Sequence, residues 1–321
     1  MGTVVALGGQ VGGAKLADGL HRLRGKDLAL VVNTGDDYEY LGLAFSPDID
    51  TALYALAGLA SIDSGWEPAA ETRALHGMLK ALGGAEQPML GDKSLAAPLL
   101  RTQGLAAGRR LTEVTLDFCR NLGIAARVLP MSDDPVRTHV LTEEGAIPFP
   151  EYFGPLACEP RVRGIEYAGA DQARIPDEIL DALHAADLET VVICPSNPYH
   201  SIRPILEISG MRELLRKRGA PVIAVTPIVG GKALRGSSGK MMRDLGKEPS
   251  PRTVAAEYLR LIDGFVLDRE DVHLVESVRS LGMQVLAAPT VMRSVDDRVT
   301  LARAVLDFAA SVRKIRALEV E

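Results

Sequence analysis

The sequence predicts an α/β protein with a doubly wound, mostly parallel, Rossmann-like sheet and a helical insertion. Short apolar runs alternate along the chain with segments of helical periodicity, which is the pattern of repeated βαβ units. Several of these runs are nearly continuous in Val, Ile, Leu and Ala, as expected for strands that are covered on both faces. With 321 residues, of which 47% are hydrophobic, the chain can bury a sizeable core, and we expect a single domain over residues 1–321.

The predicted elements follow one another in regular order. Strands are expected at 3–7, 28–33, 126–130, 138–142, 190–194, 221–226, 264–267 and 284–287. Helices are expected at 14–24, 50–60, 68–82, 95–107, 111–122, 176–186, 203–217, 251–262, 270–281 and 296–317. Between about 50 and 122 only helix patterns occur, so this segment is the predicted insertion, either as extra packing helices or as a wall over a site. Residues 143–165 are rich in Pro, Gly and Glu, and we expect them to be irregular.

The composition argues against nucleic-acid binding and membrane binding. The net charge is −6, and aromatic residues make up only 4% of the chain, with a single Trp. No apolar run approaches the ~18 residues of a membrane span, and the start of the sequence lacks the pattern of a signal peptide. The three cysteines lie far apart without a CxxC pair, which favours a reducing, cytoplasmic setting.

The first candidate for chemistry is a glycine-rich turn between the first predicted strand and the first predicted helix. Its members are Gly8, Gly9, Gly12, Gly13 and Lys15. Glycines let the backbone approach an anion closely, and a helix N-terminus offers free N–H groups to it. The spacing matches neither GxGxxG nor GxxxxGK[ST]. The segment is therefore either a phosphate site or a tight turn between strand and helix.

Acidic residues gather after the second predicted strand. They are Asp36 and Asp37 in the turn NTGDD, and Asp48 and Asp50 in the segment SPDID. Four carboxylates within fifteen positions suit Mg²⁺, which takes one or two carboxylates together with phosphate oxygens. A simple Gly-Asp turn and a helix cap at Asp50 are the structural alternatives.

Polar turns also follow the later predicted strands. They contain Ser132, Asp133 and Asp134 after 126–130, Ser196 and Asn197 after 190–194, and a Gly-Gly pair after 221–226. Ligands of open α/β sheets bind beyond the carboxyl ends of the strands, so these turns predict a nucleotide along one sheet edge. The downstream loop GSSGK at 236–240 is either a phosphate clamp or a plain loop, and we expect His200 to be structural.

Taken together, these motifs resemble one family, the 2-phospho-L-lactate transferases of coenzyme F420 biosynthesis. The most specific parts of the resemblance are SPDIDT at 46–51, MSDDPV at 131–136 and PSNPxxSI at 195–202. The segments GGxVGGAKLxDGL at 8–20 and VVNTGDD at 31–37 extend it over nearly the whole chain. A distant group, the nucleotide-sugar-binding regulators of bacterial carbon metabolism, shares the glycine start, and a non-catalytic regulator is the alternative function.

The resemblance implies a transferase reaction. A guanosine-diphosphate conjugate would donate its phospho-acid, of the 2-phospholactate, phosphoenolpyruvate or 3-phosphoglycerate type, to the ribityl hydroxyl of the deazaflavin Fo and release GMP. Positioning and charge neutralisation supply most of the catalysis in phosphoryl transfer. The resemblance also implies Mg²⁺ as the cofactor, these two small molecules as partners, and a homodimer.

Roles for individual residues follow from the same resemblance. Donor binding falls to Gly8, Gly9, Gly12, Gly13, Lys15, Asn33, Gly35, Ser196 and Asn197. Acceptor binding falls to Asp50, Lys93, Met131, Ser132, Asp133 and Asp134. The implied metal ligands are Asp36, Asp37 and Asp48, and the implied catalytic residues are Asp48 and Asp50.

One segment departs from the family pattern. Where the family has GDRDxATH, this chain has GDKSLAAP at 91–98, so that Lys93 replaces an arginine and Ser94 an aspartate. Because lysine cannot reproduce the bidentate contacts of arginine, the acceptor contact is expected to differ here. An NAD(P)-dependent oxidoreductase is a further alternative, which the missing GxGxxG spacing disfavours.

Overall fold

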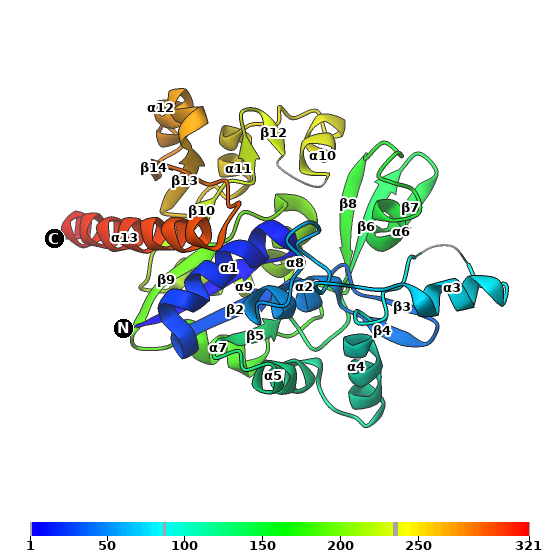
Figure 1. The fold of residues 1–321 in the computed structure, drawn as a ribbon. Coiled ribbons are helices and arrows are strands. Elements are labelled where there is room, and N and C mark those ends of the chain that lie inside the picture. The colour runs from blue at the N-terminus through cyan, green and yellow to red at the C-terminus, as the bar shows by residue number, and fades with distance from the viewer. Residues whose placement is uncertain (1, 86–87, 234–236, 321) are drawn as a thin grey trace.

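The computed structural model describes residues 2–85, 88–233 and 237–320, and a seven-stranded parallel sheet forms its centre (Figure 1). In sheet order the strands are β14 (Gln284–Ala288), β13 (Gly264–Asp268), β10 (Val222–Val225), β9 (Leu188–Ile193), β1 (Thr3–Gly8), β2 (Leu28–Val32) and β5 (Arg127–Pro130). Every pairing between these neighbours is parallel. The predicted fold class is therefore confirmed.

The direction in which successive strands are added to the sheet reverses once, although all the strands stay parallel. From β1 the chain runs outward through β2 to β5, then returns to β9 on the other side of β1 and continues through β10 and β13 to β14. The two halves of the sheet thus diverge between β1 and β9. Such a switch point leaves a crevice at the carboxyl ends of the two strands, where ligands of doubly wound proteins bind.

Helices cover both faces of the sheet, because successive residues of a strand point to opposite faces. Val4 and Ala6 of β1 belong to one core, which includes residues of α1 (Gln10–Arg24), α2 (Pro47–Leu56), α5 (Leu111–Asn121) and α13 (Val295–Val320). Val5 and Leu7 belong to the opposite core, which includes residues of α7 (Asp177–Leu183), α8 (Arg203–Glu207), α9 (Met211–Lys217), α11 (Pro251–Glu257) and α12 (Val275–Arg279). Among the described helices, none combines the length and the apolar character that crossing a membrane requires.

A second, antiparallel sheet stands apart from the main one (Figure 1). It consists of β7 (Gly145–Pro148), β6 (Arg137–Thr142) and β8 (Gly164–Ala168), with α6 (Phe149–Phe153) packed against β6. The predicted strand 138–142 therefore exists but pairs outside the parallel sheet. The expectation that 143–165 is irregular was wrong for 145–153, which form β7 and α6, whereas 154–163 contain no helix or strand.

The segment between β2 and β5 holds the hairpin β3 (Tyr38–Tyr40) and β4 (Leu43–Phe45), followed by helices. Between 50 and 122, α2 is followed by α3 (Ala74–Ala81), α4 (Ala96–Ala106) and α5, with no strand among the described residues. Elsewhere two predicted helices are divided. The helix expected at 203–217 breaks into α8 and α9 at Gly210, whose φ is 83°, and 270–281 begins as a 3₁₀-helix before α12. The short strands β11 (Ile228–Val229) and β12 (Lys232–Ala233) and helix α10 (Ser238–Asp244) lie between β10 and α11.

Candidate active site

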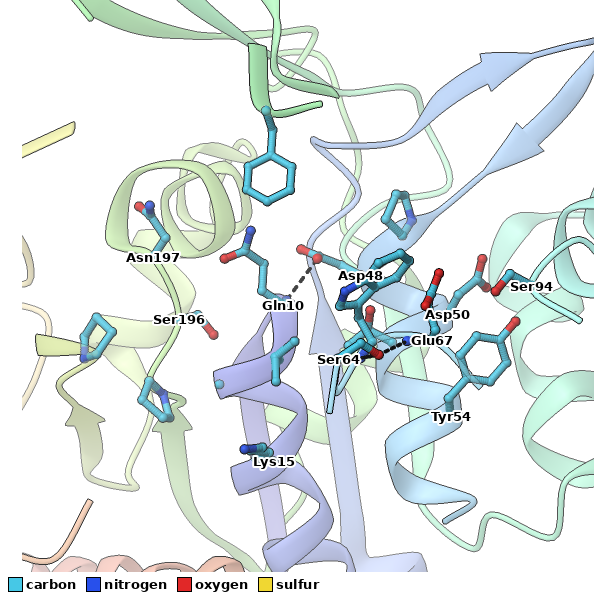
Figure 2. Close-up of a pocket in the computed structure, with 18 of the residues that line it drawn as sticks. Gln10, Lys15, Asp48, Asp50, Tyr54, Ser64, Glu67, Ser94, Ser196 and Asn197 are labelled. Atoms are coloured by element: carbon cyan, nitrogen blue, oxygen red, sulfur yellow. Dashed lines mark hydrogen bonds between the residues drawn. The ribbon is translucent and has the colours of Figure 1, made fainter. Parts of the chain in front are cut away.

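A pocket of about 960 Å³ opens at the carboxyl edge of the main sheet. Segments that directly follow four strands line it, at 10–12 after β1, 195–197 after β9, 226–227 after β10 and 290–293 after β14. The first turn of α2 and residues of the long β2–β5 connection also line it (Figure 2), as do Lys15 of α1, Phe153 of α6 and Ser238 of α10. The pocket therefore lies over the β1–β9 switch point, as the strand order requires.

The glycine-rich turn meets the PSN segment at the bottom of this crevice. The Ser196 hydroxyl accepts a hydrogen bond from the N–H of Gly9 at 3.2 Å and donates one to the Gly9 carbonyl at 2.9 Å. A Cβ at Gly9 would lie 2.2 Å from a carboxylate oxygen of Asp48, and one at Gly13 would lie 2.5 Å from the Ser196 hydroxyl. Gly12 is constrained in the same way, since a Cβ there would lie 2.3 Å from the Pro195 carbonyl oxygen, and it also lines the pocket.

Asp48 is a buried carboxylate that lines the crevice. One oxygen accepts the N–H of Gln10 at 2.9 Å, and the other accepts the Asn33 amide at 3.0 Å. Burial, together with the nearby charge of Asp36, raises the pKa of Asp48 to about 7. Near neutral pH this carboxyl can therefore gain or lose a proton or bind a cation. Asn33 itself lies behind Asp48, where its side-chain oxygen accepts the N–H of Gly35 at 2.8 Å.

Asp50, two residues further along α2, has a very different partner. It forms a bidentate ion pair with Arg101 of α4, whose guanidinium also donates to the Ala44 carbonyl at 3.1 Å. Arg101 is completely buried, so this pair fixes the Asp50 side chain from behind while the residue lines the pocket. Burial raises the pKa of Asp50, and the Arg101 charge opposes that rise. The sequence reasoning missed Arg101, since an arginine in a helical segment gives no sign of being buried.

Asp36 and Asp37 do not line the large pocket. An oxygen of Asp36 lies 3.0 Å from Nδ1 of the buried His200, whose ring stacks on Phe149. Burial raises the pKa of Asp36 and lowers the pKa of His200 to about 4, so His200 is neutral at physiological pH, in keeping with its expected structural role. Asp37 accepts the Ser46 hydroxyl at 2.8 Å, and burial raises its pKa to about 8.

The three implied metal ligands consequently face different surroundings. Within residues 2–85, 88–233 and 237–320, no group of three or more His, Cys, Asp or Glu side chains is arranged to hold a metal ion. Asp48 lines the large pocket, whereas Asp37 lines a separate cavity of about 210 Å³. A metal held with Asp48 would need the oxygens of a bound ligand to complete its shell.

The segment Met131–Asp134, implied as an acceptor wall, also lies away from the large pocket. Ser132, Asp133 and Asp134 line the smaller cavity, and Met131 is completely buried. Asp133 accepts the N–H of Thr112 at 2.8 Å, and Asp134 is paired with Arg174. These contacts hold the first turn of α5 and the segment before α7.

Two stacked rings belong to both cavities. The rings of Tyr38 and Phe45, from the hairpin β3–β4, lie 5.0 Å apart at an angle of 10°. Tyr38 and Phe45 line both the large pocket and the small cavity.

The large pocket also has apolar lining residues, which form an aromatic wall. They are Tyr38, Phe45, Tyr54, Ile62, Trp66, Met89, Leu95 and Phe153, and the polar residues Ser64, Glu67 and Ser94 line the pocket with them. Glu71 holds this wall together, because its carboxylate accepts the N–H of Lys93 and both the N–H and the hydroxyl of Ser94. Lys93 itself does not line the pocket, and its ammonium donates to the Ala69 carbonyl at 2.7 Å.

Two basic residues line the opposite end of the pocket. They are Arg293, which follows β14, and Lys15 of α1, whose ammonium donates to the Met292 carbonyl at 2.9 Å. Lys240, in the loop considered as a phosphate clamp, instead pairs with Asp244 and donates to the Pro160 carbonyl at 2.8 Å. Residues 234–236, next to that loop, lie outside the described part of the chain.

The fold and the site define a doubly wound α/β protein with a small-molecule pocket at its topological switch point. The chain belongs to the family of the 2-phospho-L-lactate transferase CofD, which its sequence matches over residues 4–292.

Named relatives match almost end to end. A phosphoenolpyruvate transferase of Streptomyces griseus is 38% identical over 97% of this chain and 99% of its own length. A 2-phospho-L-lactate transferase of Methanopyrus kandleri is 40% identical over 94% of this chain and 96% of its own. These matches identify the chain as a member of a transferase family.

A solved structure supports the fold independently. The crystal structure of a UPF0052 family protein from Bacillus halodurans superposes with a TM-score of 0.62, covering 95% of this chain and 98% of that protein. The two sequences are 17% identical, so this likeness concerns the fold alone.

Proposed function

We propose that this chain transfers a phospho-acid from its guanosine-diphosphate conjugate to the ribityl hydroxyl of the deazaflavin Fo, with release of GMP, in coenzyme F420 biosynthesis. The observation that carries the proposal is that one pocket is lined both by polar groups at the strand ends and by several aromatic side chains. The crevice suits a diphosphate, and the wall suits a flat ring system. The names of the relatives make 2-phospholactate and phosphoenolpyruvate the first donor acids to test.

In this proposal the donor lies across the β1–β9 switch point. The start of α1 and the PSN segment contact its diphosphate, and the positive charges of Lys15 and Arg293 attract it into the pocket. The deazaflavin packs against Trp66 and Tyr54, so that its ribityl chain reaches toward α2. The two substrates thus meet beside Asp48 and Asp50.

The chemistry is a single displacement at phosphorus. The ribityl oxygen forms a bond to the phosphorus of the phospho-acid, the bond from that phosphorus to the GMP oxygen breaks, and the hydroxyl proton passes to Asp50. Arg101 holds the Asp50 carboxylate in one orientation for this contact. Correct placement of the reacting oxygen supplies a large part of the rate in such a reaction.

The Asp48 carboxylate, together with phosphate oxygens of the bound donor, suits Mg²⁺. This ion takes one or two carboxylates together with phosphate oxygens, and a cation beside Asp48 would relieve its repulsion from Asp36. Asp37 does not fit, because it lines the smaller cavity. When bound, the metal would neutralise charge on the diphosphate.

A direct assay tests the proposed function. Purified protein is mixed with Fo, Mg²⁺ and one guanosine-diphospho conjugate at a time, of phospholactate, phosphoenolpyruvate or phosphoglycerate, and the products are identified by mass. A phosphodiester product with one donor is the expected result. No product with any donor, together with tight binding of a nucleotide sugar, would instead support the non-catalytic regulator.

A cytoplasmic homodimer also belongs to the proposal. Exposed apolar side chains on α3, just after it and on α4, among them Met78, Leu82, Leu99 and Leu100, support an interface on this side of the molecule. Light scattering during size-exclusion chromatography measures the assembly, and a mass near 34 kDa would contradict the dimer.

A further inference from the structure

Gln10 has an unusual backbone conformation at the centre of the pocket. It is the first residue of α1, and its φ is 55°, in the left-handed region that residues other than glycine rarely adopt. Its N–H donates to Asp48 at 2.9 Å, which fixes the peptide in this orientation. Glycine would adopt the same conformation more easily, so the presence of a long side chain here needs a reason.

The side chain of Gln10 points into the pocket. Figure 2 shows its carboxamide beside Asp48 and facing the PSN segment, with Asn197 across the crevice. Among the described residues its amide makes no hydrogen bond, since the bond to Asp48 comes from the backbone. The amide is therefore able to donate to a ligand.

The neighbouring polar groups are already engaged in holding the crevice together. The Ser196 hydroxyl both accepts from and donates to Gly9, and the Asn33 amide donates to Asp48. The side-chain oxygen of Asn197 accepts the N–H of Tyr199 at 2.8 Å. Gln10 differs from these residues because its side-chain polar atoms take no part in the internal network among the described residues, although its backbone N–H does.

A neutral donor is suited to this position. A lysine or arginine beside Asp48 would pair with its carboxylate and lose attraction for an anion. A carboxamide carries no charge, so it can donate to phosphate oxygens while Asp48 stays available for a cation or a proton.

We propose that Gln10 is a positioning residue whose carboxamide donates to the phosphate oxygens of the nucleoside diphosphate donor. The inference rests on the proposed function and deepens it, because it assigns the donor phosphates to the β1 side of the crevice. The strained backbone at Gln10 then serves to aim the carboxamide.

Three substitutions separate this role from a structural one. Gln10→Gly removes the amide and suits the left-handed backbone, so folding should not suffer. Gln10→Asn keeps a carboxamide that is one methylene shorter, on a residue that tolerates this conformation. Gln10→Glu keeps the shape but places a negative charge next to the phosphates.

The measurements are the Kd of GDP by titration calorimetry, the KM of the donor, the KM of Fo and the melting temperature. We expect Gln10→Gly to weaken GDP binding and raise the donor KM about tenfold, since a hydrogen bond to a charged group is lost. Gln10→Glu should bind GDP more weakly still. The GDP affinity of Gln10→Asn should lie between that of Gln10→Gly and that of the unchanged protein. The KM of Fo should stay constant, and the melting temperature of Gln10→Gly should not fall.

Each other result has a definite meaning. An unchanged Kd and donor KM in Gln10→Gly would overturn the inference while leaving the transferase intact. A lower melting temperature with a parallel loss of all activities would also overturn it, because it indicates a structural role. If the unchanged protein neither binds GDP nor turns over, the proposed function fails first and the inference fails with it.

Discussion

The polar half and the apolar half of the pocket are built in different ways. The polar half (Gln10, Gly12, Asp48, Ser196 and Asn197) follows strand ends and the first turn of α2, and Asp48, Ser196 and Asn197 are buried. Four members of the apolar half (Ile62, Trp66, Met89 and Phe153) come from loops and from α6 and stay exposed, with Ile62 at 90% and Trp66 at 50%, whereas its members Tyr54 and Leu95 are buried.

This difference indicates that the two halves contribute to ligand binding in different ways. The sheet fixes the polar half, so the groups that handle charge are held in place before any ligand arrives, which keeps the later reorganisation small. The apolar half exposes large side chains to water, and a ligand that covers them gains free energy from their burial. The polar groups are thus held in place by the sheet, whereas the exposed apolar side chains become buried only when a ligand covers them.

Among the substitutions that test this difference between the two halves, loss of the Asp48 charge should have the largest effect on the reaction rate. We expect Asp48→Asn to lower kcat/KM by about a thousandfold, since a buried charge in the polar half cannot be replaced by a neutral group. Steady-state kinetics at saturating Mg²⁺ measure the change. Asp117→Asn, an identical change at a half-buried position on α5 that does not line the pocket, should have no effect on the rate. A rate near normal in Asp48→Asn would mean that the polar half does not carry the chemistry.

The same substitution should change how stability depends on pH. Because the pKa of Asp48 is raised from 3.8 to about 7 in the folded protein, the folded state retains a proton that the unfolded chain has lost. The free energy of unfolding should therefore fall as the pH rises from about 4 to about 7, by up to about 4 kcal/mol for this group. His200, whose pKa is lowered from 6.5 to about 4, acts in the opposite direction but is present in both proteins.

Urea unfolding of the ligand-free protein and of Asp48→Asn at pH 5 and pH 8 measures this difference. The variant should lose less stability between the two pH values than the unchanged protein. Equal losses would show that Asp48 titrates normally and that the polar half is better solvated than its burial indicates.

The sequence predicted the polar half better than the apolar half, for a topological reason. Parallel strands place their carboxyl ends on one edge, so Gly12 and Ser196 could be assigned to one site from strand order, and Asp48 joined them through its closeness in sequence to the turn after the second strand. Gln10 escaped notice because its importance lies in a backbone angle and not in its residue type.

The apolar half depends on contacts between residues that are distant in sequence. Glu71 holds the turn at 91–94, and this pairing is invisible in a helix pattern. The segment Met131–Asp134 lies outside the large pocket, and its acceptor role stays a prediction. In the structure Asp133 holds the start of α5, because the same strand end faces the small cavity.

The boundary between the two halves is held by the ion pair of Asp50 and Arg101. Arg101→Met should lower the free energy of unfolding by about 3 kcal/mol, because it leaves a buried carboxylate without its partner. Asp50→Asn combined with Arg101→Met should be more stable than Arg101→Met alone, and a double-mutant cycle measured by urea unfolding gives the coupling. Additive single effects would show that the two halves are not anchored to each other by this pair.

Trp66 offers the mildest and most selective test of the apolar half. It is the only tryptophan in the sequence and lines the pocket, so its fluorescence should change when the deazaflavin binds and stay nearly constant when GDP binds. Trp66→Ala should raise the KM of Fo about fivefold, and Trp66→Phe should raise it less, because stacking and burial on an aromatic ring are partly kept. The donor KM should be unchanged in both variants. If the donor KM rises instead, the nucleotide occupies the apolar half, and the assignment of the two substrates to the two halves must be exchanged.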